Sequence, residues 1–298
     1  MNPMPQRSIP QSALAELADV PATSRWVHSG PVRLHALDYG GDLPPLVVLP
    51  GITSPAITMD FIARELTDLV RPVVLDVRGR GLSDDAPGHT LEAYAEDVEA
   101  LITELGLQRP LLFGHSMGAR IAAATAARAK VPVQGAVLAD PPMSGPGRGT
   151  YPTGLDAFLQ QLAEAHRGTD ADEVASHWPT WPRRERELRA HWLSSCTRDA
   201  IASTHHGFEH EDFFTWWPQM SAPVALLYGA DSPVVTSAGA AEAAETNPAA
   251  SLARIPGAGH MIFWDKPETA LAALRTALRG ILTSLEPGSD AVVKCGHA

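Results

Sequence analysis

Cysteine is scarce in this chain of 298 residues, which has only Cys196 and Cys295, the second in a polar tail. Secreted domains commonly depend on several disulfides, whereas cytosolic proteins keep their thiols reduced. So small a number of cysteines favours unpaired thiols in a reducing compartment. We therefore expect a cytoplasmic protein.

Long apolar runs and basic residues are also lacking. No stretch approaches the roughly 18 apolar residues that cross a bilayer, and residues 1–20 lack the continuous apolar segment of a secretory signal. Lysine and arginine total 23 against 34 acidic residues, which gives a net charge of -11. We expect no membrane and no nucleic-acid partner, and an anionic substrate would need a local cluster of arginines.

Short apolar runs alternate with segments that repeat apolar residues at helical spacing. This alternation predicts an α/β fold with a mostly parallel central sheet and helices on both faces, preceded by an edge hairpin. We expect strands at residues 25–29, 32–39, 46–49, 73–76, 111–113, 135–139, 223–228 and 250–255, and helices at 12–19, 58–69, 91–105, 117–128, 238–245 and 269–282.

The alternation stops between residues 143 and 219, where helical stretches carry five of the seven tryptophans. This region is predicted to be a helical insertion whose tryptophans serve packing first and pocket lining second. The predicted organisation is an N-terminal arm outside the core (1–24), a core (25–142 and 220–284), a helical cap (143–219) and a disordered tail (285–298).

The most informative motif is Gly-His-Ser-Met-Gly at residues 114–118, which lies between an apolar strand and an alanine-rich helix. A serine on this sharp turn has a strained backbone and an exposed hydroxyl at the carboxyl end of the sheet. The string alone is weak evidence, but its strand–turn–helix context makes Ser116 the predicted nucleophile.

A serine nucleophile needs a histidine as base and an acid that orients the histidine. In a fold of this topology, the acid comes first along the chain after the serine, and the histidine follows it. His260, in the small-residue loop after the last predicted strand, is the expected base. Asp231 and Asp140 each follow a predicted strand, and either can reach the histidine. Position alone favours Asp231, with Asp140 as the alternative.

The oxyanion of an acyl-transfer intermediate needs backbone donors. We expect the N–H of Met117, directly after the nucleophile, and the N–H of Ile52 in the loop after the strand at residues 46–49. Pro50 has no N–H to offer.

Other features favour simpler interpretations. Residues 145–149 resemble a phosphate loop, but the motif lysine is absent and no helix follows directly. His205, His206 and His210 are expected on a solvated face of the cap and not at a metal site. Arg78 and Arg80 are expected to brace loops around the active site in preference to binding substrate. We therefore predict no cofactor and no metal.

Four blocks carry a resemblance to known proteins: residues 49–58, 75–83, 114–120 and 140–148. The chain resembles the α/β-hydrolase fold superfamily over residues 26–283 and, within it, the N-formylmaleamate deformylases of nicotinic acid breakdown. The blocks at 49–58 and 140–148 discriminate best, because their extra residues have no obvious fold requirement.

The resemblance implies metal-free hydrolysis of N-formylmaleamate to maleamate and formate, with the family's acid at the position of Asp140. Because this chain also has Asp231, both acids stay open. Such a substrate carries a carboxylate, for which Arg148 and Arg120, with Arg78 behind them, are the candidate anchors because a guanidinium binds a carboxylate bidentately.

Two alternatives use the same fold. The first keeps the triad and exchanges the substrate for another small ester, a lactone or a diketone cleaved at a carbon–carbon bond. The second is a non-catalytic binding protein, which is disfavoured because the serine, the histidine and two possible acids are all present.

Overall fold

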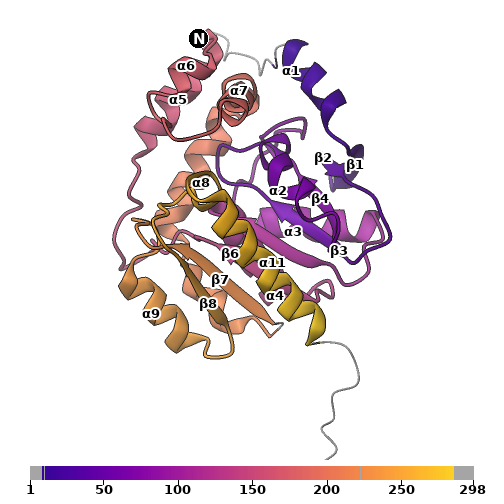
Figure 1. Cartoon of the computed structure of the whole chain (residues 1–298), viewed down its shortest axis with the longest axis vertical. Coiled ribbons are helices and arrows are strands. Elements are labelled where there is room, and N and C mark those ends of the chain that lie inside the picture. The colour runs from indigo at the N-terminus through magenta and orange to yellow at the C-terminus, as the bar shows by residue number, and fades with distance from the viewer. Residues whose placement is uncertain (1–8, 10, 222, 285–298) are drawn as a thin grey trace, which may run out of the picture.

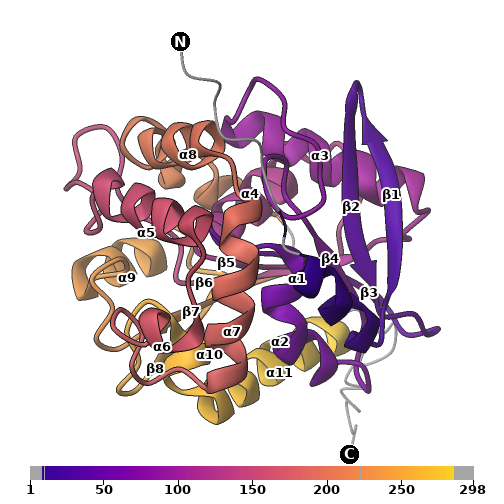
Figure 2. The same ribbon diagram turned by 90° about the horizontal axis from the view of Figure 1, so that it is seen from above.

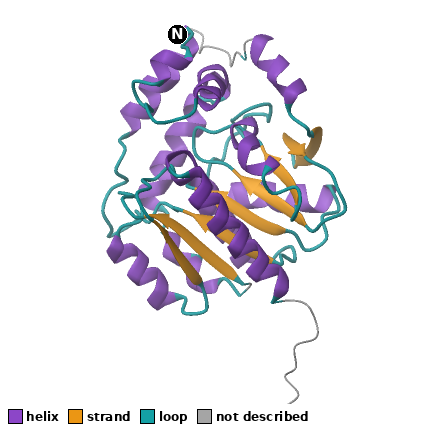
Figure 3. Cartoon of the chain, viewed as in Figure 1, coloured by secondary structure: helices purple, strands orange, loops and turns teal. Residues whose placement is uncertain are grey.

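The computed structural model describes residues 9, 11–221 and 223–284. Eight strands form one sheet in the order β1-β2-β4-β3-β5-β6-β7-β8, with β1 and β2 antiparallel at one edge and the remaining pairs parallel (Figures 1 and 3). The strands are β1 (Thr23–Ser29), β2 (Val32–Asp38), β3 (Pro45–Leu49), β4 (Arg71–Leu75), β5 (Leu111–His115), β6 (Gly135–Ala139), β7 (Val224–Gly229) and β8 (Ser251–Ile255). The predicted fold class and the edge hairpin are confirmed.

Each central strand is apolar on both faces because helices cover both. Val47 of β3 contributes to the core under α3 (Leu91–Glu104) and α4 (Met117–Arg128), whereas its neighbours Leu46 and Val48 contribute to the core under α2 (Asp60–Arg64) and α11 (Pro267–Thr283). The same alternation runs through β4 and β5. Continuous apolar runs are typical of such doubly covered parallel strands.

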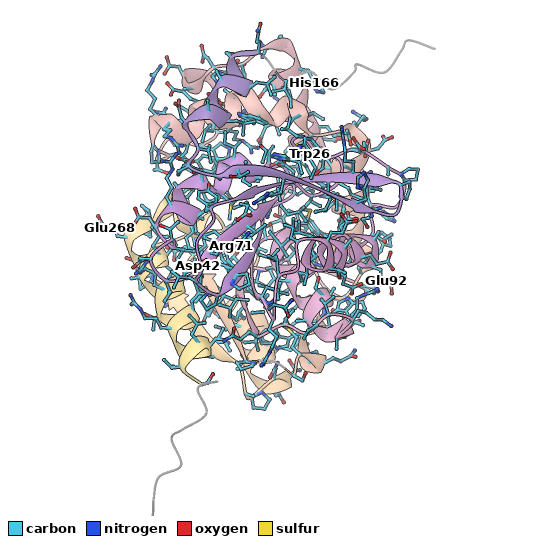
Figure 4. The ribbon with its side chains drawn as sticks, turned by 90° about the vertical axis from the view of Figure 1, so that its right-hand side faces the viewer. Trp26, Asp42, Arg71, Glu92, His166 and Glu268 are labelled. Carbon is cyan, nitrogen blue, oxygen red and sulfur yellow. The ribbon has the colours of Figure 1, made fainter. Side chains whose placement is uncertain are left out.

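Ion pairs tie the antiparallel edge to the parallel sheet. Arg71 of β4, labelled in Figure 4, donates from Nε and Nη2 to the two carboxylate oxygens of Asp38 on β2, at 2.9 and 2.6 Å. Arg25 of β1 adds a third bond to Asp38 at 3.2 Å. Charge-assisted bonds of this kind favour one register between the hairpin and the sheet.

The helix predicted at residues 58–69 is shorter than expected. The structure has a 3-10 turn, η2 (Ala56–Met59), then α2, and turns follow to residue 69. The N–H groups of Leu66 and Leu69 bond three residues back, to Ala63 and Leu66. This tighter winding brings Leu66 and Val70 into the core, where both are buried. Packing therefore overrides the helical spacing of the sequence.

A group of helices follows β6, as predicted, and lies at one end of the sheet, at the top of Figure 1 and toward the viewer in Figure 2. Its members are α5 (Leu155–Arg167), α6 (Ala171–Val174), α7 (Arg183–Trp192), η3 (Leu193–Ser195), α8 (Arg198–His210), η4 (Phe213–Thr215) and η5 (Trp217–Gln219). We call residues 143–219 the cap. After it come β7, α9 (Ser237–Thr246), β8, α10 (Ile262–Asp265) and α11.

The N-terminal arm differs from its prediction in the part that the structure describes. The segment forms α1 (Gln11–Glu16) and η1 (Leu17–Asp19), and Ala13 and Val20 are buried in the core. The Glu16 carboxylate accepts hydrogen bonds from His191 Nδ1 and Trp192 Nε1 of α7, both at 2.7 Å. Cap residues far along the chain therefore hold the arm in place. Contacts between such distant residues cannot be predicted from the sequence of the arm itself.

The predicted disordered tail at residues 285–298 lies outside the described residues, and so does Cys295. Cys196 is buried. None of the described helices combines the length and the apolar character that a bilayer crossing requires.

Candidate active site

Ser116 occupies the turn between β5 and α4 with φ +56° and ψ -120°. Two glycines allow this turn, because a Cβ on Gly114 would overlap the carbonyl of Gly118, and one on Gly118 would overlap the carbonyl of Leu49. The Ser116 N–H donates to the Ala139 carbonyl at 2.8 Å, which pins the turn to the neighbouring strand. The strained backbone predicted for this serine is present, and the flanking glycines explain how it is tolerated.

Ser116, His260 and Asp140 form one hydrogen-bonded chain. The Ser116 hydroxyl oxygen lies 2.9 Å from His260 Nε2, and His260 Nδ1 lies 2.7 Å from Asp140 Oδ2. Since a carboxylate accepts, the imidazole proton lies on Nδ1 and leaves Nε2 free to accept from the serine. This is the geometry that general-base activation of a hydroxyl requires.

The preference for Asp231 from position alone is not supported by the geometry. Asp231 is exposed, and its N–H donates to the Ala258 carbonyl at 2.9 Å. Asp140 is fully buried and also accepts hydrogen bonds from the Gly229 N–H at 3.0 Å and the Ser232 hydroxyl at 2.6 Å. Asp140, the alternative, is the carboxylate that contacts His260.

The expected oxyanion donors lie beside the nucleophile. Met117 is the first residue of α4, so its N–H has no intrahelical acceptor and points out of the helix N-terminus. Ile52 follows β3, and Arg80 Nε donates to its carbonyl at 3.0 Å. Arg80 also donates to Thr204 Oγ1 of α8 at 2.8 Å. Arg80 therefore braces the Ile52 loop, as predicted.

A cavity opens over Ser116, between the sheet and the cap. Gly51, Ile52, Ser54, Ser116 and His260 form its sheet side. Its other wall belongs to the cap, through Tyr151, Phe158, Gln161, Trp178, Trp181 and Arg189. The tryptophans of the cap thus include lining residues as well as buried ones such as Trp192 and Trp217.

Tyr151 brings a hydroxyl from the cap to the reacting groups. Its oxygen lies 3.5 Å from His260 Nε2, and its ring packs against Phe208 with centroids 4.8 Å apart. Burial raises the pKa of Tyr151, so the phenol stays protonated at neutral pH and can donate to Ser116 or to a substrate.

His115, directly before the nucleophile, is held neutral. Its Nε2 lies 3.0 Å from the His260 carbonyl oxygen, to which it donates. Burial, aided by the neighbouring His260, lowers the pKa of His115 to about 3. A neutral ring beside the serine adds no positive charge that would compete with the imidazolium formed at His260 during catalysis.

The three arginines predicted to anchor a substrate carboxylate do not line this cavity. Arg148 donates from Nη1 and Nη2 to the Glu242 carboxylate, both at 2.7 Å. Arg78 forks onto Asp97 with two bonds of 2.6 Å. These carboxylates already take the place that a substrate carboxylate would fill.

Arg120 is buried on α4 and donates from Nη2 to the Glu211 carbonyl. It lines a separate small cavity behind Met117, with His89 and Tyr94. Burial lowers its pKa to about 10, while the nearby Glu211 and Asp212 carboxylates act in the opposite direction. These carboxylates therefore offset part of the cost of burying the Arg120 guanidinium.

The histidines of α8 do not share one environment. His205 is buried, and its Nε2 lies 2.9 Å from the Thr153 carbonyl oxygen, whereas His206 is exposed. The expected solvated face is therefore wrong for His205. Within the described ranges, no three His, Cys, Asp or Glu side chains are grouped as metal ligands would be.

Sequence reasoning missed Arg189 and Tyr151. Arg189 stands in an arginine-rich helix whose first two arginines, Arg183 and Arg184, are exposed. Its spacing carries a signal, since Glu185, Arg189 and Trp192 recur at helical intervals on one buried face. A charged residue on an apolar face could therefore have been singled out. Tyr151 lies in a segment without periodicity and offers no such signal.

Comparison with known proteins agrees with this geometry. The alpha/beta hydrolase fold family matches residues 44–267. The chain is 39% identical over 249 residues to N-formylmaleamate deformylase of Pseudomonas putida strain KT2440, covering 83% of this chain and 93% of the relative. It is 27% identical to 2-(acetamidomethylene)succinate hydrolase of Mesorhizobium japonicum, covering 87% and 96%.

A crystal structure of N-formylmaleamic acid deformylase from Pseudomonas putida S16 superposes with a TM-score of 0.81 at 35% identity, over 85% of this chain and all of that one. The resemblance drawn from the four sequence blocks is confirmed. The fold matches, and the serine, the histidine and the aspartate are joined by hydrogen bonds. The chain therefore belongs to the α/β-hydrolase fold family and is a hydrolase of the kind represented by these relatives.

Proposed function

We propose that this protein is a deformylase that hydrolyses N-formylmaleamate to maleamate and formate. The observation that carries the proposal is the Ser116–His260–Asp140 chain of hydrogen bonds, which opens into the cavity between sheet and cap. The similarity to enzymes named for this reaction supports the choice of substrate. The reaction takes place in the cytoplasm and needs only protein groups and water.

In the first step, Ser116 Oγ attacks the formyl carbon while His260 Nε2 takes the hydroxyl proton. Asp140, hydrogen-bonded to Nδ1, stabilises the imidazolium that forms. The N–H groups of Ile52 and Met117 donate hydrogen bonds to the negatively charged oxygen of the former carbonyl. Donors fixed in place before the reaction stabilise this charge without reorganisation.

In the second step, the carbon–nitrogen bond breaks, and His260 gives its proton to the leaving nitrogen, which releases maleamate. Water then enters and donates a proton to His260 as its oxygen attacks the formyl–serine ester. Ser116 Oγ leaves and recovers its proton from His260, and formic acid is released, which loses its proton to water to give formate. One water is consumed, and the protein returns to its starting state.

Tyr151 is a positioning residue in this mechanism. Its hydroxyl reaches the space between Ser116 and His260 and directs the serine oxygen toward the imidazole. The surrounding rings of Phe158, His205 and Phe208 fix its orientation. A protonated phenol donates here without adding charge to the cavity.

The decisive test is to incubate the purified protein with N-formylmaleamate and measure formate and maleamate together. We expect equal amounts of both and none with Ser116→Ala. An uncharged activated ester serves as a second substrate. Hydrolysis of the ester at Ser116 without any formate from N-formylmaleamate would refute the deformylase and leave a serine hydrolase of another substrate.

A further inference from the structure

Arg189 is a buried arginine without a carboxylate partner. It lies on the inner face of α7, where its exposed fraction is 8%. In the part of the chain that the structure describes, no ion pair involves its guanidinium, whereas Arg78 has Asp97 and Arg148 has Glu242. Burial without a neighbouring carboxylate lowers its pKa to about 10, so it remains charged at neutral pH.

Among the described residues, the hydrogen bonds of Arg189 go to neutral acceptors. Nη1 donates to Thr53 Oγ1 at 3.3 Å, and Nη2 donates to Gln161 Oε1 at 2.7 Å. The guanidinium carbon lies 5.9 Å from the ring centroid of Trp178. These contacts orient the fork but do not neutralise it. Burying a charge is unfavourable unless a group of opposite charge pairs with it.

Two acidic side chains that share a second pocket with Arg189 are committed elsewhere. Glu164 and Glu173 line a shallow pocket next to Arg189. Glu173 binds Arg167 at 2.6 Å and Thr169 at 2.8 Å, and Glu164 lies 3.3 Å from His177 Nε2. The charge of Arg189 is thus left for the active-site cavity, which Arg189, Gln161 and Thr53 line together with Ser116 and His260.

The same wall holds two more donors without acceptors. The indole nitrogens of Trp178 and Trp181 are buried, and neither has a hydrogen-bond partner among the described residues. Both side chains line the cavity, and their rings stack with centroids 4.6 Å apart. A wall with one unpaired cation and two unpaired N–H donors lacks an acceptor that carries negative charge.

We propose that Arg189, oriented by Gln161 and Thr53 and flanked by Trp178 and Trp181, is the subsite that binds the carboxylate of a small acidic amide. The proposal rests on the proposed function and names the residues that select its substrate. Thr53 directly follows Ile52, the expected oxyanion donor. Because adjacent residues are about 3.8 Å apart along the chain, the two ends of the substrate bind close together, which suits a short acid.

The test compares Arg189→Met with Arg183→Met, a control on the exposed face of the same helix. We expect Arg189→Met to lower the ratio of kcat/KM for N-formylmaleamate to kcat/KM for an uncharged ester by about 100-fold, mostly through KM, since a charge-assisted fork is lost. Arg189→Lys should recover only part of this loss, because an ammonium lacks the fork. Arg183→Met should leave the ratio unchanged.

A second measurement does not depend on deformylase activity. A fluorophosphonate labels Ser116, and maleate should slow this labelling in the wild-type protein and in Arg183→Met but not in Arg189→Met. The uncharged diamide of maleic acid should not protect Ser116 of the wild-type protein from labelling. This comparison of maleate with its diamide needs no variant.

The outcomes separate the two proposals. Protection by maleate through Arg189 without formate release would support the carboxylate subsite and refute the deformylase. Formate release with an unchanged substrate ratio in Arg189→Met, or equal protection by maleate and its diamide in the wild-type protein, would overturn the subsite and leave the deformylase standing.

Discussion

The two sides of the active-site cavity are built in different ways. On the sheet side, Ser116, Asp140 and His260 stand on short loops after parallel strands, and backbone geometry holds them at hydrogen-bond distances of 2.7 to 2.9 Å. On the cap side, long side chains such as Tyr151 and Arg189 reach inward from a loop and a helix. In the proposed function, the sheet side carries out the reaction and the cap side selects the substrate.

The two sides are nevertheless joined by buried polar contacts. Arg80 donates to the Ile52 carbonyl on one side and to Thr204 of α8 on the other. Arg189 of α7 donates to Thr53, next to Ile52. A substitution in the cap can therefore change the position of the Ile52 loop. Variants on each side should separate effects on the rate of the reaction from effects on the choice of substrate.

The largest effect is expected on the sheet side, from Asp140→Asn. Without the carboxylate, the His260 ring loses its orientation and its imidazolium loses its stabilisation, so kcat should fall by about 10⁴-fold for every substrate. Asp231→Asn is the matched control, because Asp231 is exposed and no hydrogen bond joins its carboxylate to His260 among the described residues. Steady-state kinetics decide, and similar losses in both variants would contradict a single orienting acid.

His115 makes the sheet side sensitive to pH. Its folded-state pKa of about 3 lies below the ordinary value of 6.5, so below pH 6.5 the unfolded chain binds a proton that the folded protein does not. Stability is therefore lost as pH falls, by about 2 kcal/mol from this group between about pH 7.5 and about pH 5.

Urea unfolding at the two pH values measures this loss, with His115→Gln as the variant because glutamine keeps an N–H donor and does not titrate. The variant should lose less stability than the wild-type protein as the pH falls. An equal loss in both proteins would show that His115 is not buried in its neutral form.

Tyr151→Phe is expected to have a smaller effect, because it removes a single neutral donor from the cap. Losing one hydrogen bond of this kind costs about 1 kcal/mol, so kcat should fall by about five- to tenfold with KM little changed. Tyr228→Phe, a change on β7 outside the cavity lining, is the control. A rise in KM with constant kcat would show that Tyr151 binds the substrate and does not position the serine.

The smallest effect on catalysis is expected from Arg148→Ala. Its guanidinium is paired with Glu242 and Asp212 and lies over the Phe214 ring, 4.1 Å from the centroid. We expect an unchanged KM for N-formylmaleamate and a loss of about 1 kcal/mol in unfolding free energy, as for a partly exposed ion pair. A large increase in KM would show that the substrate anchor lies at the base of the cap and not at Arg189.

These two sides also differ in how much the sequence could predict. Ser116 and His260 were identifiable because strand, turn and loop order is local information. Asp140 and Asp231 both follow strands, so only the three-dimensional structure distinguishes them: the Asp140 backbone, with φ +49°, directs its carboxylate to His260. The partner of Arg148 is 94 residues away, and pairings of that kind leave no trace in local spacing.

The central claim, that Ser116 is activated by His260 and Asp140, is tested most directly by the rate at which a fluorophosphonate modifies Ser116, followed by peptide mass spectrometry. This measurement requires no knowledge of the substrate. A single adduct on Ser116 is expected, which forms rapidly in the wild-type protein and in Asp231→Asn and far more slowly in Asp140→Asn. An unmodified Ser116 in the wild-type protein, or equal rates in all three proteins, would contradict it.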